Sequence, residues 1–318
     1  MARYIIKRLL MMIPVIVFVA ILIFTIMYFV PGDPASLILG SNATEEQILA
    51  KREELGLNEP YLTRLLDFLK NLFFHFDFGS SYTTNISVTQ ELLQRFPRTL
   101  IISGVAMLVS ILVGIPIGIF AAVHQDTVFD RIAMVGAVAG ISIPTFWMGM
   151  LLVLLFSLHL GWLPANGIGG IQYYILPCLA ESLGGIANLA RQSRSSMLEV
   201  IRSDYVTTAR AKGLSERKVI FGHALPNALL PVISVLGSRL GMTLGGSLVV
   251  EQVFSIPGVG MYLINAVNNR DYPVVQGCVV FLAIVFSVVM LLTDLSYALV
   301  DPMIKAQYTS GPRRKKVA

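Results

Sequence analysis

The sequence predicts an all-α, polytopic membrane protein with six transmembrane helices, an external helical segment after the first helix, and a short helix on the cytoplasmic side. Of its 318 residues, 55% are hydrophobic and only 14% are charged, whereas about 25% are charged in an ordinary soluble domain. The mean hydropathy of +0.72 excludes both a water-soluble globule and an intrinsically disordered chain. Apolar stretches of about 20 residues, long enough to cross a bilayer, recur along the chain.

The first span is expected at residues 9–30, directly after Arg3, Lys7 and Arg8. This run is longer than the apolar core of about 7 to 15 residues found in a signal peptide, and Pro31-Gly32-Asp33-Pro34 offers no small-x-small cleavage site. We therefore expect residues 1–30 to be a retained membrane anchor.

Five further spans are expected at 100–123, 132–160, 173–190, 229–253 and 274–300. The span at 173–190 is the weakest, because it is short, contains Gly184-Gly185 and carries Glu181, so five spans are an alternative. Charge favours six. With the amino terminus in the cytoplasm, 16 of the 24 basic residues fall in cytoplasmic segments, in agreement with the positive-inside rule. The basic excess is thus a topological signal, and no nucleic-acid partner is expected.

The external segment, residues 31–98, predicts two helices and no catalytic constellation. Thr44 and Gln47 have the spacing of a capping box, and Gly56 is suited to end the helix that they begin. A second helix is expected at 61–74, where one apolar face should pack against the spans. That face consists of Leu62, Leu65, Leu66, Leu69 and Phe73.

The cytoplasmic segment 191–228 predicts a helix, a sharp bend and a second helix. Asp204 is a plausible amino cap, and Gly213 is suited to end the slim helix that follows. Ser215 can cap the next helix, which Pro226 would end or kink. Such a projection suits docking into a groove of another protein, and a solvated connecting loop is the alternative.

This segment resembles the EAA loop of bacterial ABC-importer permeases. Thr207-Thr208-Ala209, then Gly213, then His223-Ala224-Leu225-Pro226 reproduce the spacing of that loop. Thr207 and Thr208 stand where the loop usually has Glu and Ala, and His223 stands where it has Ile. These departures are similar to the dipeptide and oligopeptide branch of the family, where DYxxTARAKGL and HALxNAxxP are usual.

Motifs of the same family follow in order along nearly the whole chain. They are Lys7-Arg8-Leu9-Leu10, Pro31-Gly32-Asp33-Pro34-Ala35, Leu55-Gly56-Leu57, Asp77-Phe78-Gly79-Ser80-Ser81, Arg95-Phe96-Pro97-Arg98-Thr99-Leu100, Gly161-Trp162-Leu163-Pro164, Arg194-Ser195-Ser196-Met197-Leu198-Glu199-Val200, Val250-Glu251-Gln252-Val253-Phe254, Pro257-Gly258 and Arg270-Asp271-Tyr272-Pro273-Val274. The resemblance implies a heterodimer with a second, homologous permease subunit. It also implies two ATP-binding cassette ATPase subunits and an external solute-binding protein that delivers the cargo.

No G-x-x-x-x-G-K-[ST] loop that could hold nucleotide phosphates occurs in the chain. We therefore expect no catalytic site and no bound cofactor, with ATP and Mg²⁺ used by the partner ATPases. The resemblance implies that residues 204–213 form the coupling helix, in which Tyr205, Thr208, Ala209 and Ala211 fill the ATPase groove, Arg210 and Lys212 meet its acidic rims, and Gly213 provides the bend. The residues expected at this contact are Asp204, Tyr205, Thr207, Thr208, Ala209, Arg210, Ala211, Lys212, Gly213 and Leu214.

Cysteine and histidine offer no metal site. Cys178 and Cys278 both lie in apolar runs and are read as core residues. The four histidines have no ligand-like spacing; they are His75, His124, His159 and His223.

The fifth span carries glycines at 237, 241 and 245, a spacing that predicts close approach of a neighbouring helix. Arg239 lies about 200° around the helix from Gly237 at about 100° per residue, so it should point away from that stripe. An arginine at membrane depth costs at least about 2.5–3.5 kcal/mol. It should therefore pair with an acid, Asp294 or Glu181, or line the translocation pathway and meet a peptide carboxylate. Glu251 should contact cargo or the binding protein, or cap a helix end. The expected pathway residues are thus Arg239, Glu251, Glu181 and Asp294.

These observations predict four parts: an anchor (1–30), an external helical segment (31–98), a five-helix permease core (99–303) that includes the coupling loop 191–228, and a basic cytoplasmic tail (304–318). The expected function is one half of an inner-membrane pathway for di- and oligopeptides, with both termini in the cytoplasm. Import of nickel, a metallophore or glutathione by the same architecture is an alternative. A secondary transporter with Glu181 and Asp294 as proton sites is another, and no motif of an intramembrane enzyme appears.

Overall fold

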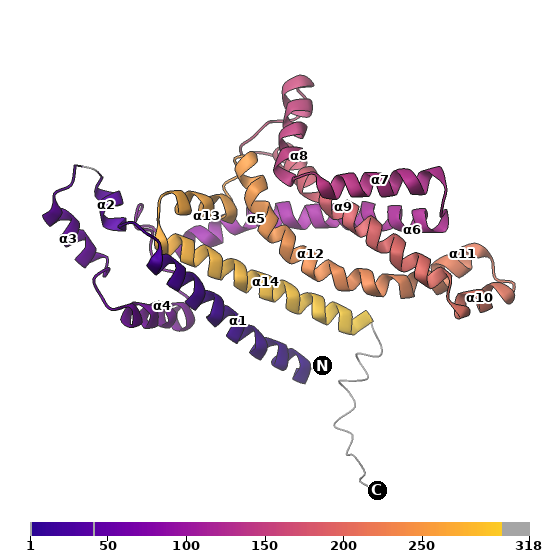
Figure 1. Cartoon of the computed structure of the whole chain (residues 1–318), viewed down its shortest axis with the longest axis horizontal. Coiled ribbons are helices and arrows are strands. Elements are labelled where there is room, and N and C mark those ends of the chain that lie inside the picture. The colour runs from indigo at the N-terminus through magenta and orange to yellow at the C-terminus, as the bar shows by residue number, and fades with distance from the viewer. Residues whose placement is uncertain (1, 41, 301–318) are drawn as a thin grey trace, which may run out of the picture.

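The computed structural model describes residues 2–40 and 42–300, which form helices and connecting loops with one isolated β-bridge between Ser80 and Ser87 (Figure 1). The all-α prediction is confirmed. The predicted tail, residues 304–318, and the last three residues of the predicted core lie outside the described residues.

The helices follow one another as an amino-terminal helix, a helical cap and a bundle. The amino-terminal helix is α1 (Ala2–Phe29), and the cap is α2 (Pro34–Leu39), α3 (Glu45–Glu54) and α4 (Tyr61–His75). The bundle consists of α5 (Val88–Val109), α6 (Ile115–Val123), α7 (Val128–Ser142), α8 (Thr145–Leu152), α9 (Gln172–Ile201), α10 (Asp204–Ala211), α11 (Glu216–Lys218), α12 (Leu225–Val253), α13 (Val259–Asn268) and α14 (Tyr272–Val300), with the π-helical turns η1 (Ser110–Gly114), η2 (Val153–His159) and η3 (Val219–Ala224).

The cap begins as the sequence predicts. Thr44 and Gln47 form the capping box at the start of α3, with Thr44 N donating to Gln47 Oε1 at 2.9 Å and Gln47 N donating to Thr44 Oγ1 at 3.3 Å. Gly56 follows the helix at φ +63°, a conformation that glycine adopts without strain. The predicted helix at 61–74 is α4.

The apolar face of α4 is rotated from the prediction. Leu65 and Leu72 are buried, whereas Leu62 and Leu66 are exposed. The rotation follows from the contact with α1, where the ring of Phe68 stacks on that of Phe24 with centroids 5.5 Å apart. Aromatic packing across this contact selects the buried side.

Four continuous helical runs are long and apolar enough to cross a membrane: Arg8–Phe29, Val88–Val123, Glu216–Val253 and Tyr272–Ser296. A fifth arises if α7 and α8 with η2 count as one span, although the two halves are bent by 103°. Helix α9 carries Glu181, Arg191 and Arg194 and does not reach the same hydropathy over the described residues. The total of six spans therefore stays a prediction.

The expected continuous span at 132–160 is wrong, because the helix breaks between Ser142 and Thr145. Ile143 precedes Pro144 and adopts an extended backbone, φ −83° and ψ 123°, as residues before proline prefer. Figure 1 shows the result: α8 leaves the bundle, while α7 lies along it.

Pro226 does not end the second predicted helix of the 191–228 segment. The helical run from Glu216 to Val253 passes through the wide turn η3 and continues into α12, with Pro226 in the first turn of α12. At the first turn of a helix the missing N–H of proline costs no internal hydrogen bond.

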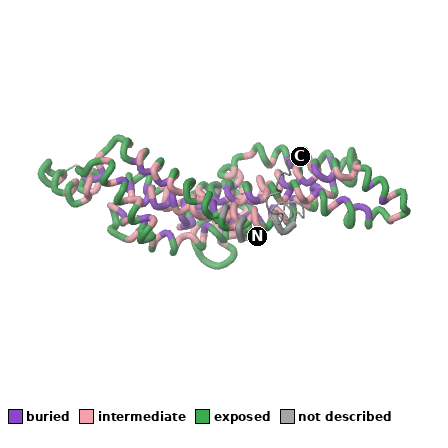
Figure 2. Tube along the Cα trace, turned by 90° about the horizontal axis from the view of Figure 1, so that it is seen from below, coloured by how far each residue is buried: buried purple, intermediate pink, exposed green. Residues whose placement is uncertain are grey.

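Two loops lie at one end of the molecule. The turn between α6 and α7 and the pair α10–α11 lie at the right of Figure 1, the amino-terminal end of α1 and the last turns of α14 point toward the same side, and the cap lies at the opposite end. Buried segments run along the middle, and both tips are largely exposed (Figure 2). This arrangement agrees with the predicted sidedness of the helices, without fixing which end faces the cytoplasm.

Helix α9 lies at the centre of the bundle and is approached closely on two sides. A Cβ atom on Gly114 or Gly118 would collide with the α9 backbone at Ile186 or Ala190, and one on Gly185 would collide with the Ser110 side chain. These glycines bring η1 and α6 into backbone contact with α9. The other side of α9 packs against α12.

The glycine stripe of α12 behaves as predicted at two of its three positions. Gly237 stands against Thr293 and Gly241 stands against Phe286, both on α14. A Cβ on Gly245 would meet no atom within 4 Å, so this glycine is not part of the helix contact.

We predict that Gly118→Ala weakens the bundle. The added Cβ would displace α6 from α9, and overpacking of this kind costs about 1–3 kcal/mol. Thermal unfolding in detergent should therefore begin at a lower temperature. Gly104→Ala is the matched control, because a Cβ there meets no atom within 4 Å; equal melting temperatures for the two variants would contradict the close contact.

Candidate functional site

The coupling loop folds back on the end of the bundle. Helix α10 begins after Ser203, whose backbone is extended, and the chain turns at Gly213 with φ +78°. Ser203 is the cap residue, and Asp204 lies in the first turn, where its negative charge stabilises the helix amino terminus. The prediction of Asp204 as the cap is therefore wrong by one residue, and that of Gly213 as the bend is right.

The inner side of α10 is part of the protein's own core. Val206 and Ala209 are buried in a cluster with Met197 of α9 and with Val219 and Ile220 of η3. Ala209 is only 6% exposed, so it is not available to fill a partner's groove as expected. The sequence pattern alone did not show which side of α10 would be covered by η3, in the second half of the loop.

Arg210 also differs from expectation, because it binds within its own chain. Its Nη2 donates to Glu216 Oε1 at 2.6 Å, and its Nη1 donates to the Ile201 carbonyl at 3.5 Å. The hydrogen bond from Glu216 raises the pKa of the Arg210 guanidinium. Arg210 thus holds α10, the end of α9 and α11 together instead of meeting an acidic rim.

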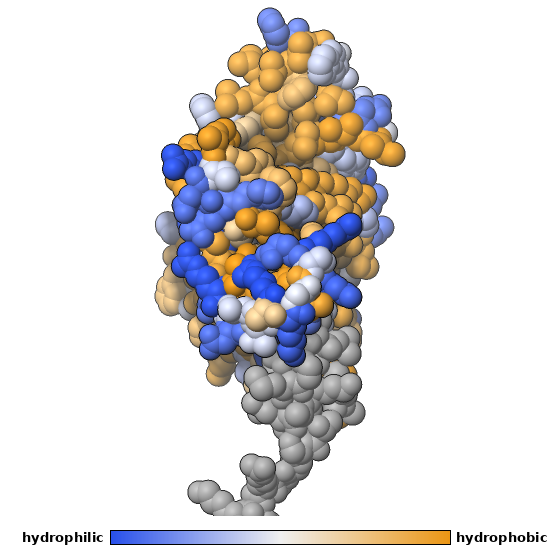
Figure 3. Space-filling model, turned by 90° about the vertical axis from the view of Figure 1, so that its right-hand side faces the viewer, coloured by the Kyte–Doolittle hydropathy of each residue, from blue (hydrophilic) through white to orange (hydrophobic). Residues whose placement is uncertain are grey.

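The outer side of α10 remains open. Asp204, Tyr205, Thr208, Ala211 and Lys212 are exposed, and their spacing places them along one side of the helix. Figure 3 views this end of the molecule and shows hydrophilic residues surrounding a smaller hydrophobic patch. We call these five residues the outer face of α10. Thr207 and Gly213 are exposed beside it, and Leu214 is partly buried.

A buried ion pair ties α9 to α7 near the same end. Arg194 Nε and Nη2 donate to the two Asp130 oxygens at 2.5 Å and 2.6 Å. The carboxylate also accepts from Asp126 N at 3.0 Å and is 2% exposed as a residue. Forked pairing of this kind fixes orientation as well as distance, so α7 and α9 are joined close to the coupling loop.

The structure separates Arg239 from both acids considered as its partners. Asp294 pairs with Arg8 of α1, with the Asp294 Oδ2 atom 2.9 Å from Arg8 Nη1. Glu181 Oε2 is buried without a hydrogen-bond partner among the described residues. No ion pair between described residues includes Arg239, so neither of the two acids considered is its partner in this chain.

Glu251 is a structural residue and does not face a pathway. It is 0% exposed, accepts from Thr99 Oγ1 at 2.5 Å, and accepts from Met261 N at 2.9 Å. Gly258 and Gly260 lie so close to its carboxylate that a Cβ on either would collide with it. Of the two roles considered for Glu251, the structure supports capping, here of the first turn of α13.

Sequence reasoning missed the partners of Glu251 in the 95–100 motif. Thr99 Oγ1 also accepts from Val259 N at 2.9 Å, and Arg98 Nη1 donates to the Pro257 carbonyl at 3.2 Å. The family motif contained both residues, but only folding brings α5 beside the loop before α13.

A second buried acid, Asp271, fixes the loop after α4. It accepts from Ser81 Oγ at 2.5 Å, from Thr83 Oγ1 at 2.9 Å and from Tyr82 N at 3.0 Å. Burial in this loop raises the pKa of Tyr82. The motifs at 77–81 and 270–274, which are far apart in the sequence, therefore form one joint between the cap and α14.

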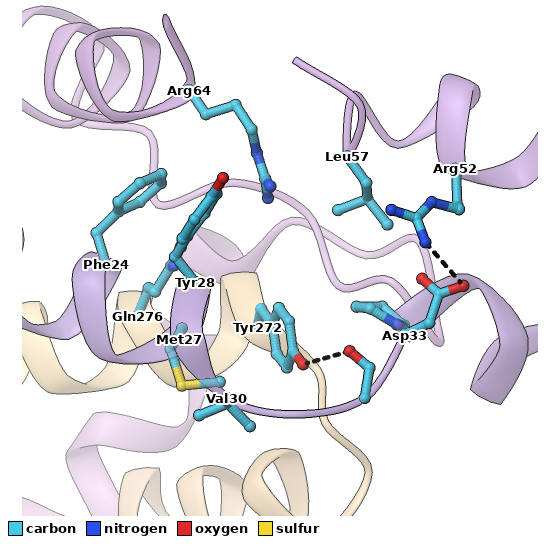
Figure 4. Close-up of a pocket in the computed structure, with 12 residues that line it drawn as sticks. Phe24, Met27, Tyr28, Val30, Asp33, Arg52, Leu57, Arg64, Tyr272 and Gln276 are labelled. Atoms are coloured by element: carbon cyan, nitrogen blue, oxygen red, sulfur yellow. Dashed lines mark hydrogen bonds and ion pairs between the residues drawn. The ribbon is translucent and has the colours of Figure 1, made fainter. Parts of the chain in front are cut away.

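A pocket of about 290 Å³ lies where the cap meets the outer ends of α1 and α14 (Figure 4). In it, Arg52 Nη1 is 3.7 Å from Asp33 Oδ2, and the Arg64 guanidinium lies 5.7 Å from the centre of the Tyr28 ring. Tyr272 OH donates to the Gly32 carbonyl at 3.4 Å. These contacts join the 31–35 motif to α3 and α14, and α4 to α1, so the pocket is part of the joint that holds the cap.

The geometry describes a class of protein before any comparison is made: a multi-pass membrane protein with a rigid loop exposed at one end and a capped opposite end. Two family models match the sequence, the binding-protein-dependent transport system inner membrane component over residues 114–306 and its amino-terminal component over residues 1–103. The chain belongs to this family of ABC-importer permeases and is a transport component of the inner membrane.

Curated relatives match over almost the full length. The glutathione transport system permease protein GsiC of Salmonella typhimurium is 42% identical over 305 residues, covering 96% of this chain and 99% of the relative. A putative peptide transport system permease protein of Brucella abortus is 42% identical over 313 residues, with the same coverage.

A solved structure shares the fold. An inward-facing MetNI methionine ABC transporter aligns with a TM-score of 0.57 at 17% identity, covering 67% of this chain and 97% of the solved one. At this identity the likeness concerns the fold alone. The part of this chain outside the alignment is about as long as the predicted anchor and external segment together.

We predict that Glu251→Gln destabilises the protein without changing cargo preference. The amide keeps one acceptor oxygen and presents its NH2 group at the other position, facing either Thr99 or Met261, and a buried group left unsatisfied costs about 1–3 kcal/mol. The melting temperature in detergent should fall. Combined with Thr99→Val, the loss should be smaller than the sum of the two single losses. Altered cargo selection at unchanged stability would contradict the structural role.

Proposed function

We propose that this chain forms one half of the translocation pathway of an importer for short peptides, with a homologous permease subunit as the other half. An external solute-binding protein delivers the cargo, and two partner ATPases use ATP and Mg²⁺, so this chain itself binds no cofactor. The relatives named for glutathione and peptide transport support peptides as the cargo class. Glutathione is itself a peptide and falls within the proposal.

The observation that carries the coupling role is the division of α10 into two sides. Its inner side is buried in the bundle, and Arg210 binds Glu216 and the end of α9, so α10 moves with α9 and α12. Its outer face is exposed at a single end of the molecule. A force applied to that face reaches the spans directly, as coupling to a closing ATPase dimer requires.

The proposed sidedness puts the α10 end and both termini in the cytoplasm. Sixteen of the 24 basic residues then lie on that side, as the positive-inside rule favours. The external cap would face the binding protein. The pathway would run along the side of α9 and α12 that carries Arg239, since no described acid neutralises this arginine and a hydrated pathway would.

ATP dependence separates this proposal from a gradient-driven transporter. In proteoliposomes that hold the complete complex, with the binding protein and glutathione on its outer side, uptake should require ATP and should stop with vanadate. A protonophore alone should have little effect. Uptake that persists with vanadate and collapses with the protonophore would instead indicate an ion gradient.

Single cysteines on α10 test the coupling contact. Thr208→Cys lies on the outer face and should crosslink to an ATPase subunit, whereas Val206→Cys, which is 0% exposed, should not. The native cysteines Cys178 and Cys278 are buried and provide a silent background. Crosslinks from residue 206, or none from residue 208 in an ATP-hydrolysing complex, would exclude the proposed contact.

A further inference from the structure

Helices α9 and α12 run antiparallel and bring Arg191 level with Arg239. One hydrophobic cluster joins Ala180 of α9 to Val250 of α12, and another joins Met197 of α9 to Ala228 of α12. Between these two points, residue 191 of α9 faces the level of residue 239 of α12. The two arginines therefore lie at the same level on neighbouring helices.

The two arginines share an open side of the bundle. On α12, Ser234, Ser238 and Met242 are exposed, Met242 at 69%. On α9, Arg191 is exposed, and a Cβ on Gly184 would meet no atom within 4 Å. Helical spacing places these residues along one strip, which we call the α9–α12 polar face.

No acid pairs with the two positive charges of this face. No ion pair or side-chain hydrogen bond between described residues includes the Arg191 or Arg239 guanidinium. The acids of α9 on either side of Arg191 are Glu199 and Glu181, eight and ten residues away, which is about 12 Å and 15 Å at 1.5 Å per residue. Two guanidinium groups of like charge at one level of a membrane protein are stabilised by an anion or by water.

We propose that Arg191 and Arg239 together form a carboxylate-binding site in the pathway, which selects cargo that bears a free carboxylate. The proposal rests on the proposed function, because it assigns the ligand chemistry of the same pathway. Guanidinium groups bind carboxylates through two parallel N–H···O bonds. Every peptide with a free carboxyl terminus, glutathione included, presents this group.

A cysteine at Met242 reports the local charge without any cargo. Met242 is three residues from Arg239 and therefore adjacent to it on the helix surface. In the assembled complex, Met242→Cys should react with a negatively charged thiosulfonate about tenfold faster than with a positively charged one of similar size. Modification is read by mass spectrometry of the peptide that contains residue 242, so that cysteines of the partner subunits do not contribute.

Charge removal should abolish the preference. In Met242→Cys combined with Arg191→Gln and Arg239→Gln, the ratio of the two rates should approach one. Arg131→Gln is the matched control, because Arg131 is an exposed arginine of α7 and belongs to neither α9 nor α12, and it should leave the ratio unchanged. Uptake of glutathione should show an increase in KM of about tenfold for each arginine removed.

Three outcomes would overturn the proposal. A ratio near one in the Met242→Cys protein, or a ratio that survives loss of both arginines, would exclude an anion site while leaving the pathway itself in place. No reaction with either reagent would show that the face is closed to water, and would exclude the proposed pathway as well. Absence of ATP-driven uptake by the wild-type complex would exclude the proposed function alone.

Discussion

The close contact of α9 with its neighbours is the constraint on which the other features depend. Helix α9 is too polar to cross a membrane on hydropathy alone, yet it is the centre of the bundle. Gly114, Gly118 and Gly185 let η1 and α6 approach its backbone. These contacts leave no exposed residue between 180 and 190, and Arg191, Ser195 and Glu199 are exposed along one side of the carboxyl-terminal half of α9. The end of α9 also determines where α10 lies.

Buried acids fix the joints between segments that are distant in the sequence. Glu251 holds the loop before α13 against Thr99, Asp271 holds the loop after α4, and Asp130 holds Arg194. A buried carboxylate is stable only when hydrogen bonds satisfy it, so each of these positions specifies a single arrangement of its neighbours. The rigidity of the two ends follows from these joints, while the open face between them contains arginines with no acidic partner among the described residues.

Local features could be predicted from the sequence, whereas pairings between distant segments could not. The capping box at Thr44, the bend at Gly213 and the glycine contacts at 237 and 241 depend on neighbouring residues or on helical spacing, and the structure contains them. The partners of Asp294 and Glu251 depend on which helices meet, and no periodicity encodes that. The break at Pro144 could have been predicted, because proline restricts the backbone of the residue before it. The uninterrupted run of hydrophobic residues favoured a single helix instead. The family motifs contain the residues of these joints, but the sequence does not show which segments they connect.

Under the proposed coupling role, substitutions on the two sides of α10 have different consequences. Substitutions at Val206 or Ala209 alter the core of the protein, and they affect the packing of that core whichever ATPase is the partner. Substitutions at Tyr205, Thr208 or Ala211 leave that core intact. A duplicated gene could therefore acquire a new ATPase, or come to share one with another importer, through a few changes on a single helical surface, while the rest of the permease keeps its fold and its choice of cargo.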